Sequence, residues 1–195
     1  MQTDEECANQ GRNIAKQMAQ MFGEMSPAQY ENCILLQGHV GAGKTTFARG
    51  LIRELSPSTE HQDIPSPTFC LDFEYELDDD NLSMTFTRGV HHLDLYRLPG
   101  TNPNDLHALE FSELTRNGIT LVEWPDRLET RAIVLPGALR VDIELSNTNA
   151  AFPVTESTST KYMTEDMFEQ LIAVPRCVTY GCSADSIWAP YIQSL

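Results

Sequence analysis

A glycine-rich segment has the residue types and spacing of a phosphate-binding loop. Residues 38–45 read GHVGAGKT, which matches GxxxxGK[ST], and the apolar run 34–36 is typical of the strand before such a loop. Glycines allow the backbone to direct N–H groups at phosphate oxygens, and the helix that follows adds the positive end of its dipole. Lys44 would supply charge to the phosphates, and Thr45 would offer a hydroxyl to Mg²⁺. We therefore expect ATP and Mg²⁺ as ligands.

The residues after the loop indicate the helix that this motif requires. Apolar side chains recur at helical spacing until Ser56 and Pro57 end the pattern; they are Phe47, Leu51, Ile52 and Leu55. Strand, loop and helix thus follow one another in the expected order. This context favours nucleotide binding over a glycine-rich turn that precedes a helix by chance.

Hydrolysis of a bound triphosphate normally needs a carboxylate at the end of a neighbouring strand. Glu123 follows the apolar run 119–122 and would hold Mg²⁺ through water or orient the attacking water; the alternative is a side chain that faces solvent. Asp94 stands among apolar neighbours, where a carboxylate needs a partner or a metal unless it alternates outward. Thr68 lies in a proline-flanked segment after the loop helix, where nucleoside triphosphatases often sense the γ-phosphate.

The spacing of apolar residues predicts the elements that position these side chains. An amphipathic helix begins with the capping-box pattern of Thr3 and Glu6 and ends before Gly23. Segments 69–75 and 82–86 alternate on either side of an acidic turn and predict an antiparallel hairpin. Further elements are strands over 90–97, 119–122 and 139–145 and a helix over 104–115. The mixture predicts an α/β domain on a mixed sheet.

The composition changes after the strand predicted over 139–145. Residues 146–149 and 155–160 are polar and poor in core-forming side chains. We therefore predict a domain over residues 1–145 and a C-terminal extension over 146–195 of unknown function. Within this extension, residues 164–173 have the apolar spacing of one more helix.

The charge of the chain favours a protein partner over a nucleic acid. Thirteen Lys and Arg against 28 Asp and Glu give a formal net charge of −15. A chain of this charge is unsuited to gripping polyanions by a broad surface, whereas a protein with a basic face is a suitable partner. The first residues are acidic where a targeting segment is basic, and no apolar stretch has the length of a membrane span. We expect a cytoplasmic protein without membrane contact, with an organellar form as the alternative.

Other metal-binding patterns are weak. Five scattered cysteines do not resemble a disulfide framework and favour a reducing compartment. Cys177 and Cys182 lack a second ligand pair, so they are interpreted as ordinary thiols. His91 and His92 are adjacent on a predicted strand and would face opposite sides, which argues against a shared metal.

Five segments together resemble the TsaE (YjeE) family, over approximately residues 4–145. They read GHVGAGKTTF from residue 38, RGL from 49, SPTF from 66, HLDLYRL from 92 and EWP from 123. The resemblance implies a P-loop NTPase-like, three-layer domain on a mixed parallel and antiparallel sheet. It also implies a small ATPase required for threonylcarbamoyl transfer to adenosine 37 of tRNA. Members act on TsaD and TsaB, are not themselves the transferase, and meet tRNA only through that complex.

The resemblance also implies roles for individual residues. Thr68 matches a switch-like segment, Asp94 the functional aspartate, Glu123 the magnesium-associated glutamate and Trp124 an aromatic neighbour tied to activity. Thr45 matches the other magnesium ligand. The residues expected to bind the nucleotide are Gly38, Gly41, Ala42, Gly43, Lys44, Thr45 and Thr46.

Two segments depart from the family pattern. Residues 7–11 read CANQG where the family usually has Thr-x-x-Leu-Gly, so the resemblance does not imply a nucleotide contact from this position. The Gly-Arg common after the last strand is replaced by residues 146–151, so contacts from that region would be weaker or come from elsewhere.

Two other functions fit the loop. A P-loop kinase for a small molecule or nucleoside usually needs an arginine-bearing lid, but region 97–117 has only Arg97 and Arg116. The other alternative is a nucleotide-dependent binding module with negligible hydrolysis in the absence of its partners.

Overall fold

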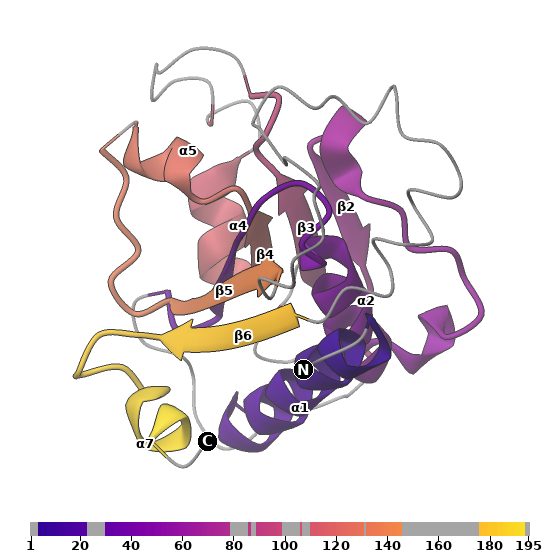
Figure 1. The fold of residues 1–195 in the computed structure, drawn as a ribbon, viewed down its shortest axis with the longest axis horizontal. Helices are drawn as coiled ribbons and strands as arrows, with labels where there is room; N and C mark the ends of the chain where they lie inside the picture. The colour runs from indigo at the N-terminus through magenta and orange to yellow at the C-terminus, as the bar shows by residue number, and fades with distance from the viewer. Residues whose placement is uncertain are drawn as a thin grey trace.

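Four parallel strands form the centre of a six-stranded sheet, and an antiparallel strand lies at each edge (Figure 1). The computed structural model describes residues 4–22, 30–78, 86, 89–98, 106, 110–130, 132–145 and 176–193. Across the sheet, the strands are β2 (Asp72–Tyr75), β3 (Val90–Asp94), β4 (Ile119–Glu123), β1 (Cys33–Gln37), β5 (Leu139–Leu145) and β6 (Arg176–Gly181).

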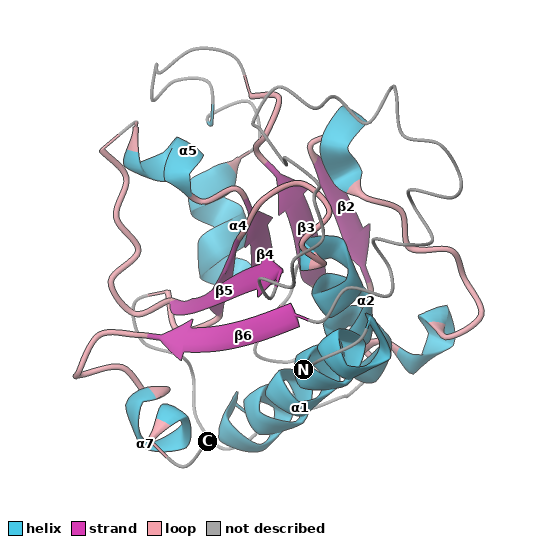
Figure 2. Cartoon of the chain, viewed as in Figure 1, coloured by secondary structure: helices cyan, strands magenta, loops and turns pink. Residues whose placement is uncertain are grey.

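The central strands are apolar because helices cover both faces of the sheet (Figure 2). One hydrophobic cluster joins the sheet to α1 (Asp4–Phe22) and α2 (Lys44–Leu55). A second cluster joins the opposite face to α4 (Phe111–Asn117) and α5 (Asp126–Glu129). Two layers of helices around one sheet confirm the predicted three-layer α/β class.

Sequence periodicity explains the two helices on the first face. The buried side chains of α1 recur every three or four residues, and α2 buries a similar stripe against them. The buried positions of α1 are Cys7, Gly11, Ile14, Ala15, Met18 and Phe22. This packing places the first turn of α1 beside the loop that precedes α2.

Most predicted elements within the described residues are confirmed, with shifted ends. The antiparallel partner of β2 in this part of the chain is β3, whereas Phe86 is buried outside any strand. Residues 82–85 of the predicted hairpin and 164–173 of the predicted helix lie outside the described residues. The helix predicted over 104–115 is described from Phe111 and continues to Asn117. Short 3₁₀ helices at Pro57–Thr59 and Pro67–Phe69 complete the connection from α2 to β2.

The described part of the C-terminal segment belongs to the sheet. β6 pairs with β5 from Leu145 opposite Arg176 to Arg140 opposite Gly181. The Tyr180 hydroxyl on β6 donates to Gln10 Oε1 of α1 at 2.7 Å. The boundary predicted at residue 145 therefore does not separate residues 176–193 from the domain. It followed a polar composition that begins at residue 146, before the chain resumes the sheet.

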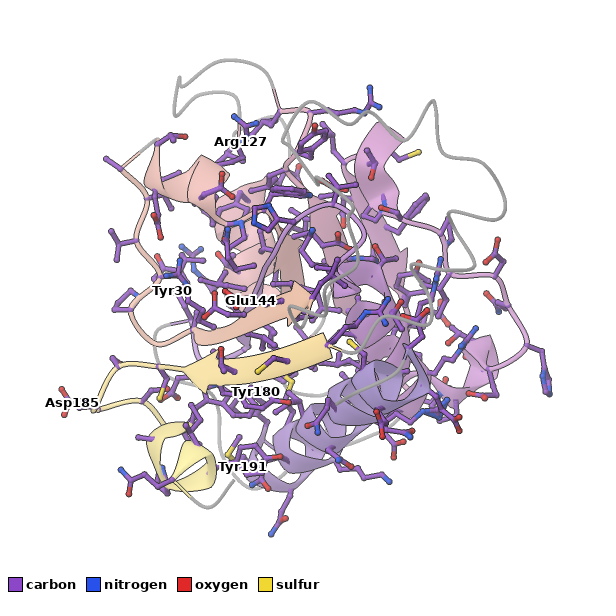
Figure 3. The ribbon with its side chains drawn as sticks, viewed as in Figure 1. Tyr30, Arg127, Glu144, Tyr180, Asp185 and Tyr191 are labelled. Atoms are coloured by element: carbon purple, nitrogen blue, oxygen red, sulfur yellow. The ribbon has the colours of Figure 1, made fainter. Side chains whose placement is uncertain are left out.

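The core also includes residues after β6. Trp188, just before the short helix α7 (Ala189–Ile192), is completely buried, and its ring lies edge-on to Phe22 with centroids 6.4 Å apart. Its Nε1 donates to the Glu31 carbonyl at 2.9 Å. Tyr191 on α7 packs against the same cluster (Figure 3).

No helix within the described ranges combines the length and hydropathy of a membrane span.

Truncating Trp188 tests whether this segment stabilises the domain. We expect Trp188→Ala to lower the free energy of unfolding by about 3–5 kcal/mol, as for other buried aromatic residues. Urea denaturation measures the change. Val134, which is 74% exposed, supplies the control, because Val134→Ala should change stability by less than about 0.5 kcal/mol. Equal stability of the two variants would contradict the described packing of Trp188.

Candidate functional site

The predicted loop leaves the carboxyl end of β1 in a conformation that needs glycine. Gly38 and Gly43 have φ angles of 150° and 111°. A Cβ atom at Gly38 would lie 2.3 Å from the Ile143 carbonyl oxygen, so a side chain has no room there. The loop turns tightly, since the Ala42 amide donates to the His39 carbonyl at 3.1 Å.

The remaining loop positions lead into α2. Gly41 has a φ of 77° at the exposed part of the loop, and Thr46 lies in the first turn of α2. Backbone N–H groups at the beginning of a helix have no carbonyl partner within that helix. They form a donor set suited to an anion at this end of the sheet.

Lys44 is buried against the loop with its ammonium group held in place. Its Nζ donates to the carbonyl oxygens of Gly38 at 2.8 Å and His39 at 2.9 Å. The same atom lies 4.0 Å from the centroid of the Trp124 ring, a cation–π contact. Burial lowers the pKa of Lys44, whereas the nearby carboxylates of Glu123 and others act in the opposite direction.

Glu123 joins the strand β4 to the loop. Thr45 donates its hydroxyl to Glu123 Oε1 at 2.8 Å, and His92 Nε2 lies 2.8 Å from the same oxygen. Glu123 is 2% exposed, and burial alone would raise the pKa of its carboxyl group. The hydrogen bond and charge of His92, the Lys44 charge and the Thr45 hydroxyl outweigh burial and hold the pKa of Glu123 below its ordinary value. The side chain therefore faces the loop and is ionised at neutral pH.

His92 is a site residue that the sequence analysis did not select. It is completely buried and lies two residues before Asp94 on the same face of β3. The period-two spacing of His92 and Asp94 is the signal that would have placed them together. Its neighbour His91 contacts Asp72 with its Nδ1 at 3.0 Å, as expected for a side chain on the opposite face.

Asp94 is buried and lies beside Glu123, at the same level of the neighbouring strand. The two residues are register partners in β3 and β4, so their side chains leave the same face. Thr68 donates its hydroxyl to Asp94 Oδ2 at 2.5 Å, and the Tyr96 amide donates to Oδ1 at 2.8 Å. The Ser66 hydroxyl lies 3.4 Å from Oδ2. The structure thus brings the segment 66–69 to the ends of the central strands.

Trp124 covers the ammonium group of Lys44. Its backbone has a φ of 62°, a conformation that few large residues adopt, and its amide donates to the Leu36 carbonyl at 3.3 Å. The Tyr96 ring packs against the indole with centroids 4.8 Å apart. The structure therefore brings the predicted site residues together at the carboxyl ends of the central strands. They are Lys44, Thr45, Thr68, Asp94, Glu123 and Trp124.

The loop also contacts β6 and the segment 7–11, one of the two segments that depart from the family pattern. Arg176 of β6 donates from Nε to the Ala42 carbonyl at 2.8 Å and forms an ion pair with Asp4 at 2.8 Å. The Cys7 thiol lies 3.6 Å from the Gly43 carbonyl. Burial raises the pKa of Cys7 to about 11, although Arg176 acts in the opposite direction. Sequence reasoning missed Arg176, because a lone arginine after a long polar stretch carries no signal.

Oxygen atoms suited to a magnesium ion lie next to this loop. Mg²⁺ is usually held by one or two carboxylates or hydroxyls together with the phosphates of its nucleotide. Thr45 and Glu123 offer such a pair, and the loop amides and Lys44 offer donors for phosphate oxygens. The residues present therefore fit a magnesium nucleotide.

Comparison with known proteins supports one family. The family model described as threonylcarbamoyl adenosine biosynthesis protein TsaE matches residues 2–152. The TsaE protein of Rickettsia felis is 31% identical over 138 residues, which cover 71% of this chain and 69% of that protein. The Aquifex aeolicus protein is 34% identical over 122 residues, covering 63% and 74%. The Synechocystis protein is 38% identical over 118 residues, covering 60% and 67%.

A solved structure of Bacillus subtilis YdiB is also similar, with a TM-score of 0.46 and 22% identity over 76% of each chain. This likeness is too distant to carry an argument. The family model, by contrast, spans most of the sequence, and the curated relatives share its description. The chain belongs to the TsaE family of tRNA threonylcarbamoyladenosine biosynthesis proteins.

Proposed function

We propose that this chain is a Mg²⁺-dependent ATPase that assists threonylcarbamoyl modification of adenosine 37 in tRNA. The observation that carries the ATPase proposal is the 2.8 Å hydrogen bond from Thr45 to Glu123. It connects the phosphate-binding loop to a strand-end carboxylate, the two halves of a hydrolytic site. Membership of the TsaE family supports the place in tRNA modification.

The loop and Lys44 bind the triphosphate in this proposal. Positive-φ glycines turn the loop amides toward the anion, and α2 adds its positive dipole end. Lys44 is held by two loop carbonyls, so little side-chain freedom is lost when a phosphate arrives. Trp124 covers the ammonium group and limits its access to water, which strengthens its attraction to phosphate.

Thr45 and Glu123 are the residues that would hold Mg²⁺. A bound magnesium ion would neutralise charge on the phosphate oxygens. His92 contacts Glu123 Oε1 within the core and fixes the orientation of the carboxylate. In this proposal, the role of Glu123 is therefore to bind the metal ion.

Asp94 then remains as the residue that orients water. Its Oδ1 accepts the Tyr96 amide and its Oδ2 the Thr68 hydroxyl, which fix the carboxylate at the end of β3. A carboxylate in this position accepts a hydrogen bond from a water molecule and aligns it for attack. Thr68 connects Asp94 to the segment 66–69, which would respond to the γ-phosphate.

The partner in this proposal is a complex of TsaD and TsaB-like proteins. The chain acts on that complex and is not the transferase, and tRNA is reached only through it. The net charge of −15 supports contact with a basic protein face over direct contact with RNA. A cytoplasmic location is part of the same proposal.

Removing the Lys44 charge tests nucleotide binding. We expect Lys44→Ala to weaken ATP binding by about 10- to 100-fold, because hydrogen bonds from a charged donor are lost. Isothermal titration calorimetry measures the dissociation constant. Lys16→Ala is the control, since the Lys16 side chain is 62% exposed and forms a surface ion pair with Glu54. Equal affinities for the two variants would refute the assignment of Lys44.

Removing the Glu123 charge tests catalysis separately. Glu123→Gln keeps the shape of the side chain, and we expect ATP binding to persist while hydrolysis slows by about 10²- to 10³-fold. Release of labelled phosphate, with and without the TsaD and TsaB-like proteins, measures the rate. Glu129→Gln, at a position 61% exposed, should hydrolyse ATP like the wild type. Label on a small-molecule acceptor would instead support a kinase, and full activity of Glu123→Gln would show that Glu123 is misassigned.

Depletion of the protein tests the pathway. We expect threonylcarbamoyladenosine to fall in total tRNA, because the proposed ATPase sustains the modifying complex. Mass spectrometry of tRNA nucleosides measures the loss, and expression of the wild type, but not of Lys44→Ala, should restore it. Unchanged modification after depletion would exclude the proposed place in tRNA modification.

A further inference from the structure

Arg176 contacts the phosphate-binding loop at the Ala42 carbonyl, whereas Lys44 contacts it at the carbonyls of Gly38 and His39. It is the first residue of β6 and lies outside residues 2–152, the part of the chain that matches the family model. Its side chain is 3% exposed, and its Nε donates to the carbonyl oxygen of Ala42 at 2.8 Å. Burial of a charged guanidinium is unfavourable unless the group has hydrogen-bond and charge partners, so the groups that it contacts indicate its role.

The geometry of the peptide bond gives this contact a consequence for the loop. In a trans peptide, the carbonyl of one residue and the N–H of the next point in opposite directions. A donor that fixes the Ala42 carbonyl therefore fixes the Gly43 N–H as well, pointing away from Arg176.

We propose that Arg176 is a positioning residue of the nucleotide site, which orients the Ala42–Gly43 peptide so that the Gly43 N–H donates to a bound phosphate. The inference rests on the proposed ATP binding and adds to it a residue from the C-terminal segment. Arg176 touches no part of the nucleotide. It acts through the loop.

Neighbouring groups hold the guanidinium against the loop. Asp4, in the first turn of α1, forms an ion pair with Arg176 at 2.8 Å and balances its charge. A Cβ atom at Gly43 would lie 2.9 Å from Arg176 Nε, so the arginine side chain packs directly against the loop. The Cys7 thiol, 3.6 Å from the Gly43 carbonyl, supports the next peptide from the same side.

Arg176 also lies close to the place of a departure in the sequence. The Gly-Arg expected after the strand 139–145 is replaced by residues 146–151. Arg176 is the register partner of Leu145, the last residue of that strand. An arginine therefore stands beside the end of β5, although 30 residues separate the two in the chain (146–175).

Four variants test the proposal by ATP affinity in calorimetry. We expect Arg176→Met to weaken ATP binding about tenfold, the effect of one hydrogen bond from a charged donor. Arg176→Lys keeps a charged donor and should recover most of that affinity. Asp4→Asn combined with Arg176→Met removes the unpaired Asp4 carboxylate and should remain as weak as Arg176→Met. Arg140→Met, which loses a surface ion pair on the adjacent strand, should bind ATP like the wild type.

A second measurement needs no nucleotide. Hydrogen exchange over residues 38–45 in the nucleotide-free protein should be faster in Arg176→Met than in Arg140→Met, with melting temperatures recorded for both. Wild-type affinity and unchanged exchange in Arg176→Met would overturn the proposal, as would full recovery of affinity on adding Asp4→Asn. If the wild type itself does not bind ATP, the proposed function fails, whereas a failure confined to Arg176→Met leaves that function standing.

Discussion

The parallel pairing of β1 with β4 is the constraint on which the candidate site depends. It places the end of β1, where the loop begins, beside Glu123, and the pairing of β4 with β3 adds Asp94 at the same level. In an open α/β sheet, side chains at the carboxyl ends of neighbouring strands converge outside the sheet. The hydrogen bond from Thr45 to Glu123 forms because β1 and β4, although far apart in sequence, have their carboxyl ends side by side.

The carboxyl ends of these strands also bring together charged side chains, whose burial is normally unfavourable. Lys44, Asp94 and Glu123 are each at most 5% exposed. Each retains partners: loop carbonyls for the ammonium group, hydroxyls and an amide for Asp94, and Thr45 and His92 for Glu123. Buried charges are tolerated when hydrogen bonds replace water, and such networks are expensive to rearrange. These charged groups therefore have hydrogen-bond partners within the protein itself.

Local patterns predicted the strands and the loop because each depends on residues close together in sequence. The spacing of β3, β4 and β5 and the glycine positions of the loop are such patterns. Local spacing could have placed His92 with Asp94, but it could not predict that His92 contacts Glu123 or that Arg176 contacts the loop. Both contacts depend on how the strands pair. The polar residues after Leu145 resembled a domain boundary, although the chain later returns to pair with β5. Periodicity identifies a strand, but it does not say which edge of the sheet that strand will occupy.

The pairing of β6 with β5 also sets an order for assembly during synthesis. Chains emerge from the ribosome at about 5–20 residues per second, N-terminal segments first. The loop after β1 and the helix α2 are thus available well before Arg176 has been made. Until β6 docks, the Ala42 carbonyl lacks its donor, and Asp4 lacks its counter-charge. A nascent chain therefore lacks both contacts of Arg176 until β6 has been made and has paired with β5.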